Sequence, residues 1–340
     1  MKKLAILGAG SWGLTLAWLN GAQHENVWLW DRNPDKVAAM SRDRKVLFPL
    51  PVILPQKLNL TASLEEAVRD ADVILMVVTV SGTREVLRRL RDEVKLPRQV
   101  VLVNASKGIE FPSLKRMSEV FAEEMPDNPY AVLSGPTLAM EILNGLPTAC
   151  SIACEDLEIA EALQRDLSHD LFRLYSNTDV TGVELGGALK NIFAIASGYM
   201  KQKQLGDNAL GALITRGLSE MTRFSVALGA DPESLYGMSG LGDLLATANS
   251  PLSRNFQVGA RLAQGETLDN ILTDLKVVAE GVKTTHAVYE LSHKMGLDTP
   301  IVDMVEMCLS GPFSEKMIVK SLMTRKLKSE QKEASGKPLL

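Results

Sequence analysis

The chain has 340 residues, more than a single hydrophobic core usually organises, so we expect two domains, and a hydrophobic content of 46% can fill both. Its formal net charge of −4 at pH 7 and its interspersed basic residues exclude a general attraction to nucleic acid. No apolar run approaches the roughly 20 residues of a transmembrane helix, and no signal-peptide pattern is present, so we expect a cytoplasmic protein.

Short apolar runs alternate with helix-like or turn segments through the first half, namely KLAILG, NVWLWD, DVILMVV, QVVLVNAS, YAVLSG and TACSIAC. This alternation predicts an α/β domain with helices on both faces of a doubly wound parallel sheet, because its strands are nearly continuously apolar. The stretch 44–63 contains Pro49, Pro51 and Pro55, and we expect a loop with one edge strand there. The last strand signal is LFRLYSN at 171–177.

From Asp179 onward almost every segment has a helical pattern, which predicts a second, all-helical domain. We place the first domain at 1–178 and the helical domain at 179–326. The remaining residues, 327–340, have no apolar stripe and are expected to form a polar tail.

The glycines Gly8, Gly10 and Gly13 have the spacing GxGxxG between a strand pattern that ends at Leu7 and a helix-like segment. This context is typical of dinucleotide binding. The first glycine allows the tight turn, the second lets the backbone approach a pyrophosphate, and the third lets helix and strand pack closely. The helix N-terminus supplies free N–H groups for the phosphates. A turn that is merely rich in glycine is the alternative, and it requires three coincident glycines.

Asp31 and Arg32 follow the second strand pattern and predict opposite cofactors. Asp31 lies 21 residues after Gly10, where an acidic side chain binds the ribose 2′-hydroxyl of NAD. Arg32 is a residue type that pairs with the 2′-phosphate of NADP. The cofactor is therefore NAD or NADP, and a solvated strand end is the alternative for this pair.

Lys190 and Asn191 stand among small and apolar residues in the helix-like run ELGGALKNIFAIASGY. Burying an ammonium without a partner is costly, so this lysine is either a site residue or a residue that extends past small neighbours to solvent. If Lys190 is a site residue, Gly186 and Gly187 would make room for a ligand beside it, because residues three and four positions apart are neighbours on a helix.

Two further segments carry candidate site residues. In GLGDLLATA, Asp243 and Thr247 are four apart and share a helical face, and Ser253, Arg254 and Asn255 follow in a turn. The planar guanidinium of Arg254, with the neutral donors of Ser253 and Asn255 beside it, could bind a phosphate. The alternative is that Ser-Arg-Asn is an ordinary helix start. In VNASKGIE, Lys107 follows a strand, at the sheet edge where such folds bind ligands, although a lysine in a loop is by itself no sign of a site.

The cysteines and histidines predict no metal site. Cys150 and Cys154 lie in the strand-like TACSIAC, where residues four apart share a side, so a two-cysteine clip is the alternative to two buried reduced thiols. No HExxH or CxxC spacing occurs. The other candidates lie far apart: Cys308, His24, His169, His286 and His293.

Taken together, the motifs resemble the bacterial type of NAD(P)-dependent glycerol-3-phosphate dehydrogenase. The resemblance runs in order to about residue 325 through GAGSWG, NASKGIE, LSGPTLAMEI, ELGGALKNIFAIASGY, GLGDLLATA with SRNFQVG, and VVAEGVKTT. It implies a Rossmann domain, a helical domain like that of 6-phosphogluconate dehydrogenase, and interconversion of dihydroxyacetone phosphate and sn-glycerol 3-phosphate for phospholipid synthesis. Asp31 departs from the family pattern, in which a small residue is commoner there.

The resemblance also implies roles for individual residues. In the implied reaction a hydride passes between the nicotinamide C4 and the substrate C2, while Lys190 exchanges a proton with the C2 oxygen. Asp243, with Thr247 on its face, would orient Lys190, and Lys107 and Asn191 would stabilise charge on that oxygen. The implied cofactor contacts are Ser11, Trp12, Arg32, Lys107, Ala139, Arg254, Val278 and Glu280. The implied substrate contacts are Lys107, Gly135, Thr137, Lys190, Asp243, Ser253, Arg254 and Asn255.

Two rival functions stay open at this point. A β-hydroxyacid dehydrogenase shares the two-domain plan and a helix lysine but binds a carboxylate, which an arginine fork does not distinguish from a phosphate. A non-catalytic NAD(H)-sensing protein shares the cofactor domain but needs no buried lysine. We expect a small-molecule substrate as partner, and the Met- and Leu-rich helical domain favours a homodimer.

Overall fold

The computed structural model describes residues 1–47, 51–275, 280–311, 324 and 327. The chain divides into two compact units, Met1–Lys107 with Arg116–Val183, and Gly108–Lys115 with Glu184–Leu340. We keep 1–178 and 179–326 as the proposed domain boundaries, because the last strand ends at Asn177 and the long helix α8 begins at Val180. The tail expected at 327–340 lies outside the described residues apart from Leu327.

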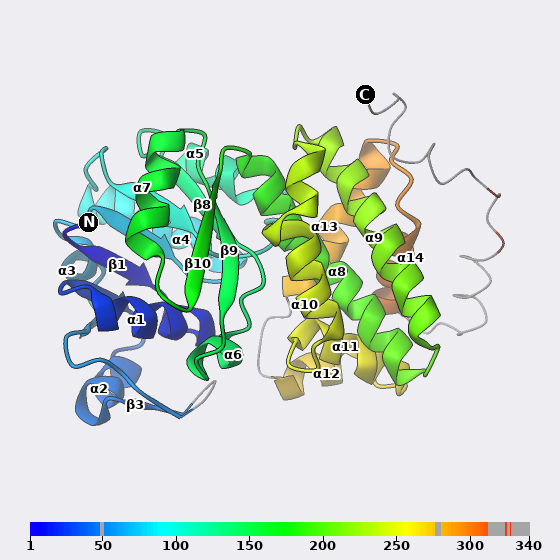
Figure 1. Ribbon diagram of the computed structural model, residues 1–340, viewed down its shortest axis with the longest axis horizontal. Coiled ribbons are helices and arrows are strands. Elements are labelled where there is room, and N and C mark those ends of the chain that lie inside the picture. The colour runs from blue at the N-terminus through cyan, green and yellow to red at the C-terminus, as the bar shows by residue number, and fades with distance from the viewer. Residues whose placement is uncertain (48–50, 276–279, 312–323, 325–326, 328–340) are drawn as a thin grey trace. The chain divides into compact units, whose positions relative to one another are not determined.

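The first unit is built on an eight-stranded sheet (Figure 1). All neighbouring strands are parallel except β8 and β9, which are antiparallel. The expected parallel sheet is therefore a mixed one. The β8–β9 connection contains only the five-residue helix α6, instead of a helix long enough to carry the chain back along the sheet. In spatial order the strands are β10 (Phe172–Asn177), β9 (Thr148–Ala153), β8 (Tyr130–Ser134), β7 (Val101–Asn104), β6 (Val73–Met76), β1 (Leu4–Leu7), β2 (Val27–Trp30) and β5 (Asn59–Thr61).

Helices cover both faces of this sheet. Leu4 and Ile6 of β1 belong to a buried cluster with residues of α1 and α7, whereas Ala5 and Leu7 belong to a second cluster with residues of α3, α4 and α5. Because successive strand residues point to opposite faces, both faces are buried, as the continuous apolar runs predicted. The helices of this unit are α1 (Ser11–Gln23), α2 (Pro34–Asp43), α3 (Leu64–Val68), α4 (Val80–Arg89), α5 (Met117–Glu124), α6 (Ala139–Leu143) and α7 (Leu157–Leu167).

The stretch 44–63 contains the edge strand that was expected there, which is β5. It also contains a two-stranded antiparallel ribbon, β3 (Lys45–Val46) with β4 (Val52–Ile53), that was not predicted. Strands of two residues are too short to leave a periodic signal in the sequence.

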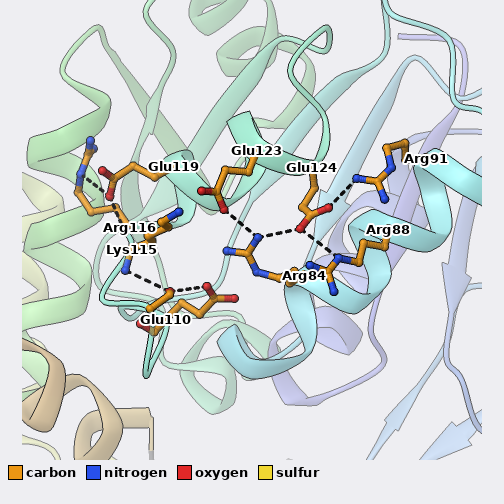
Figure 2. A network of polar contacts seen from close by, with 10 residues as sticks. Arg84, Arg88, Arg91, Glu110, Lys115, Arg116, Glu119, Glu123 and Glu124 are labelled. Atoms are coloured by element: carbon orange, nitrogen blue, oxygen red, sulfur yellow. Dashed lines mark hydrogen bonds and ion pairs between the residues drawn. The ribbon is translucent and has the colours of Figure 1, made fainter.

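A network of arginines and glutamates joins α4 to α5 (Figure 2). Glu124, at the end of α5, accepts from Arg84 and Arg88 of α4 and from Arg91 of the π-helical turn Leu90–Val94. Burial opposes the ionisation of Glu124, but the bonds and charges of these arginines outweigh it and hold its pKa below the ordinary value. The three arginines therefore compensate the negative charge of Glu124, a carboxylate that is almost fully buried.

The described part of the second unit is mainly helical, as predicted (Figure 1). Its central helix α8 is buried at every residue from 182 to 199, which explains why the sequence of this helix is apolar nearly all round. Among the described residues, no helix is long and apolar enough to cross a membrane. The helices are α8 (Val180–Gln202), α9 (Asp207–Ala227), α10 (Asp243–Asn249), α11 (Arg254–Ala263), α12 (Leu268–Leu275), α13 (Glu280–Lys294) and α14 (Pro300–Ser310).

Candidate active and cofactor sites

The glycine turn between β1 and α1 needs glycines for steric reasons. Gly8 has φ +114°, and a Cβ built on it would lie 2.7 Å from the Val77 carbonyl oxygen. A Cβ on Gly13 would lie 1.8 Å from the Gly8 carbonyl oxygen, so the turn closes tightly on the helix. By contrast, a Cβ on Gly10 would meet no atom within 4 Å. The space beside Gly10 is open at the helix N-terminus.

This turn fits the pyrophosphate of a dinucleotide. Gly10 is the N-cap of α1 and makes no side-chain capping bond, so the first backbone N–H groups of the helix are available to an anion. Ser11 and Trp12 are half-buried at this end, and the indole N–H of Trp12 is buried without a partner in the protein. A buried donor without a partner is costly, and a bound ligand would satisfy it.

Asp31 follows β2 and points back to the glycine turn. Its Oδ2 accepts from the Ala9 N–H at 3.3 Å and from Lys36 Nζ at 2.7 Å, and its Oδ1 accepts from the Asn33 N–H at 3.0 Å. Arg32 beside it is exposed. Sequence reasoning missed Lys36, although Asn-Pro at positions 33 and 34 is a helix-start signature that would have placed it in the first turn of α2.

Lys107, Gly135 and Thr137 lie together at the carboxyl ends of β7 and β8. Lys107 Nζ donates to the Gly135 carbonyl oxygen at 2.7 Å and to Thr137 Oγ1 at 2.9 Å. Gly135 has φ +144°, and a Cβ there would lie 2.5 Å from Cys150 Cβ. Ala139, the first residue of α6, is half-buried. This edge of the sheet is where doubly wound folds bind ligands.

Cys150 and Cys154 are buried and not bonded to each other, and Cys308 is also a free thiol. Within the described ranges no group of three or more potential metal ligands occurs. Burial raises the pKa of the Cys308 thiol to about 12, so the thiol form predominates at neutral pH.

In the second unit, Lys190 of α8 meets Asp243 and Thr247 of α10. Lys190 Nζ donates to Asp243 Oδ1 at 2.8 Å and to Thr247 Oγ1 at 2.6 Å, and Thr247 also donates to Asp243 at 3.2 Å. Lys190 is 7% exposed and Asp243 1%. Lys190 therefore does not extend to solvent, and its charge is paired inside the protein.

The backbone around Gly186 brings this cluster together. Gly186 lies one helical turn before Lys190, and a Cβ there would lie 2.8 Å from the Ser239 carbonyl group. Ser239 belongs to the π-helical turn Met238–Gly242 that leads directly into Asp243. The expectation that Gly186 makes room for a ligand is wrong, because the backbone of this turn fills that space.

Asn191 and Asn255 form a second polar pair in the same unit. Asn255 Nδ2 donates to Asn191 Oδ1 at 2.8 Å, while Asn255 Oδ1 is buried without a partner in the protein. A Cβ on Gly281, at the start of α13, would lie 2.4 Å from that oxygen, so any other residue there would have to displace the Asn255 side chain. Sequence reasoning missed Gly281, which no local pattern distinguishes.

The Ser-Arg-Asn turn is a helix start that leaves an arginine exposed. Ser253 caps α11 by accepting from the Phe256 N–H at 3.3 Å, and Arg254 is the exposed first residue of that helix. The helix-start interpretation and the anion interpretation are therefore compatible. Glu280 is half-buried at the start of α13, and Val278 lies outside the described residues.

These arrangements have defined chemical capacities. A buried, paired ammonium such as Lys190 can hold or release a proton at a reacting atom. In the first unit the Lys107 ammonium can donate to an oxygen that gains negative charge, and in the second unit the amides of Asn191 and Asn255 can do the same. The glycine turn with Asp31 can hold a dinucleotide.

Comparisons with known proteins agree over nearly the whole chain. Residues 3–160 match the family model of the NAD-dependent glycerol-3-phosphate dehydrogenase N-terminus, and residues 179–320 match that of its C-terminus. A glycerol-3-phosphate dehydrogenase [NAD(P)+] of Nitratidesulfovibrio vulgaris is 45% identical over 331 residues, covering 96% of this chain and 100% of the relative. One of Citrifermentans bemidjiense is 42% identical, covering 97% and 99%. The crystal structure of the Coxiella burnetii glycerol-3-phosphate dehydrogenase has a TM-score of 0.89 at 34% identity, covering 95% and 99%.

Proposed function

The chain belongs to the NAD-dependent glycerol-3-phosphate dehydrogenase family, and from this premise we propose which of its residues carry out each part of the reaction. It is a glycerol-3-phosphate dehydrogenase that interconverts dihydroxyacetone phosphate and sn-glycerol 3-phosphate with NAD or NADP. The family relates this reaction to phospholipid metabolism. The hydrogen-bonded cluster of Lys190, Asp243 and Thr247 is the observation on which the assignment of residues depends.

Lys190 is the general acid and base. Reduction of the substrate carbonyl requires a proton at the C2 oxygen, and oxidation requires its removal. A nicotinamide dinucleotide held at the glycine turn would supply or accept the hydride. Asp243 and Thr247 hold the Lys190 ammonium in one orientation through bonds of 2.8 and 2.6 Å. Lys107 and Asn191 stabilise the charge that develops on the C2 oxygen.

The remaining candidates bind and orient the two ligands. Arg254 and Asn255 hold the substrate phosphate, since Arg254 is exposed at a helix N-terminus and the Asn255 amide nitrogen, which gives one of its two N–H groups to Asn191, has a second to donate. Further proposed substrate contacts are Gly135, Thr137 and Ser253. The proposed cofactor contacts are Gly8, Gly10, Ser11, Trp12, Gly13, Asp31, Arg32, Lys107, Ala139, Arg254, Val278 and Glu280.

Initial rates with dihydroxyacetone phosphate and each reduced cofactor test the function. We expect oxidation of NADH or NADPH that depends on the phosphorylated ketone. Turnover of β-hydroxy acids with oxidised cofactor, but not of this substrate, would favour the hydroxyacid dehydrogenase alternative. Cofactor binding without any turnover would favour the sensor alternative. Membership of the family argues against both.

The homodimer and the cytoplasmic location belong to the same proposal. The proposal of a homodimer rests on the Met- and Leu-rich composition of the helical domain, in which Val226, Tyr236, Leu245 and Leu252 are individually exposed apolar side chains. Cys150 and Cys154 are buried thiols that form no disulfide, which supports a reducing compartment. Light scattering coupled to size-exclusion chromatography would measure the assembly, and a single monomer mass would contradict the dimer.

A further inference from the structure

Lys36 makes a contact that the cofactor motif does not require. Its Nζ donates to Asp31 Oδ2 at 2.7 Å and to the Ala9 carbonyl oxygen at 2.7 Å, so it links α2 to the glycine turn. The Asp31 side chain is 13% exposed and that of Lys36 40%. The pair is therefore partly desolvated, which makes it stronger than an ion pair at the open surface.

The hydrogen bonds of Asp31 leave room for one more donor. A carboxylate offers about four lone-pair positions. The N–H groups of Asn33 and Ala9 and the Lys36 ammonium take three of them. Asp31 can thus still accept from a ribose 2′-hydroxyl, which is how an acid at this position binds NAD.

The charges around Asp31 favour a 2′-phosphate as well. A carboxylate alone at this position repels the phosphate that distinguishes NADP from NAD. Here Lys36 offsets the charge of Asp31, and Arg32 adds a second positive charge at the end of β2. Asp35, in the first turn of α2, and Arg32 are both exposed and are screened alike, so the half-buried Lys36 is the cation on which the balance depends.

We propose that Lys36 makes this site tolerate the 2′-phosphate. By offsetting the charge of Asp31, it allows the site to accept a nicotinamide dinucleotide with or without that phosphate. This inference rests on the proposed function only in requiring that the glycine turn binds the cofactor. It concerns the adenosine end of the cofactor and is independent of the proton transfer at Lys190.

Equilibrium binding of NADPH and NADH to the full chain, measured by isothermal titration calorimetry without substrate, tests this proposal. Lys36→Met should raise the Kd of NADPH roughly ten-fold or more, while that of NADH changes at most about three-fold. Lys36→Gln removes the charge but keeps a donor for the Ala9 carbonyl, and should have the same effect if Met disturbs the fold. Circular dichroism checks that both variants are folded.

A double variant distinguishes compensation of the Asp31 charge by Lys36 from direct contact between Lys36 and the 2′-phosphate. In Lys36→Met with Asp31→Asn, the carboxylate that Lys36 offsets is gone, so NADPH affinity should return to within about three-fold of wild type. Lys57→Met is the matched control, because Lys57 pairs with Glu25 at the surface of the same unit and should leave both affinities unchanged.

Two results would overturn the proposal. Equal weakening of NADH and NADPH in both Lys36 variants would mean that Lys36 only ties α2 to the glycine turn. A double variant as weak for NADPH as the single one would mean that Asp31 is not the group on which Lys36 acts. Failure of the proposed function is distinguishable, because it would abolish reduction of dihydroxyacetone phosphate by the wild type whatever the ratio of the two Kd values.

Discussion

Lys190 Nζ donates a 2.8 Å hydrogen bond to Asp243 Oδ1, although the two residues lie 53 positions apart in the sequence. Both side chains are almost fully buried, so neither charge is compensated by bulk water. Separating such a pair leaves an uncompensated buried charge, which typically costs about 3–5 kcal/mol. The pair therefore links the proposed proton transfer to the stability of the helical unit.

Replacement of Lys190 by Met should abolish most of the turnover. Positioned proton transfer contributes roughly 10² to 10⁴ in rate, and we expect kcat for dihydroxyacetone phosphate to fall by at least this factor. Cofactor affinity, measured by fluorescence titration, should stay within about three-fold, since the glycine turn is unchanged. Because Lys190→Met removes the ion pair of the buried Asp243, the double variant with Asp243→Asn serves as a check that lost turnover is not lost folding.

The matched control is Lys201→Met, which removes an exposed lysine from the last turn of the same helix. It should retain normal turnover. Near-normal turnover of Lys190→Met itself would mean that the lysine is structural and that the proposed proton transfer is wrong.

Replacement of Gly186 by Ala should disturb the same cluster without removing any of its groups. The added methyl group would overlap the Ser239 backbone, which would have to move together with the turn that positions Asp243. We expect kcat to fall roughly ten-fold or more, since small misplacements of reacting groups are costly. The Kd of NADH should not change.

Gly211→Ala is the control for this experiment. Gly211 is an exposed residue of α9 where a Cβ would meet no atom within 4 Å. Alanine there should stabilise the protein by up to about 1 kcal/mol and leave kcat unchanged. If both variants have equal and normal kcat, the close approach at Gly186 does not position the active site.

The phosphate preference should depend on Arg254. Lysine at this position keeps the charge but loses the planar two-pronged geometry. Arg254→Lys should reduce the ratio of kcat/KM for dihydroxyacetone phosphate over unphosphorylated dihydroxyacetone roughly ten-fold. Arg261→Lys alters an arginine of the same helix that pairs with Glu266 and Asp274, and should keep the ratio. An unchanged ratio in Arg254→Lys would place the phosphate elsewhere.

The contribution of Glu220 to stability should fall between pH 5 and pH 8. This carboxyl group is 2% exposed and accepts from the N–H groups of Ile301 and Val302 at the start of α14. Burial raises its pKa to about 7, although these N–H groups favour the ionised form. The unfolded chain therefore ionises first as pH rises. The stabilising contribution is fully present below about pH 4.5 and is lost as pH rises through 7.

Denaturant unfolding at several pH values measures this effect. The wild type should lose on the order of 3 kcal/mol from Glu220 over this range, and Glu220→Gln should be flatter with pH because glutamine does not titrate. Exposed Glu233→Gln is the control and should follow the wild type. Parallel pH curves for wild type and Glu220→Gln would contradict the expectation.

The network of Figure 2 should lose its stabilising contribution at low pH, whereas Glu220 loses its contribution at high pH. The pKa of Glu124 lies below its ordinary value, so its contribution is present above about pH 4.5 and is lost as pH falls through the lower folded value. At pH 7, Glu124→Gln should cost about 1.5–3 kcal/mol, the usual range for hydrogen bonds to charged groups. Glu123→Gln, which affects a more exposed partner of Arg84, should cost less. Equal unfolding free energies for these two variants would show that burial of Glu124 adds nothing.

The local patterns of the sequence were sufficient for most of the architecture. The alternation of apolar runs with helical segments predicted the strands that are buried on both faces, because periodicity reports which sides of an element are apolar. The spacing of four between Asp243 and Thr247 predicted their common helical face, which the structure shows. The spacing of the glycines predicted the turn after β1, because only glycine tolerates the close contacts found at Gly8 and Gly13.

The tertiary structure alone decided which distant segments meet. No local pattern indicates that β9 runs antiparallel to β8, that Lys36 bonds to Asp31 beside the glycine turn, or that the Ser239 backbone rather than a ligand fills the space at Gly186. The sequence showed that Lys190 needed a partner, but it left both its burial and the identity of that partner open. An amino-acid sequence determines which face of a helix is apolar, whereas the partner across that face depends on how all the elements pack together into one dense core.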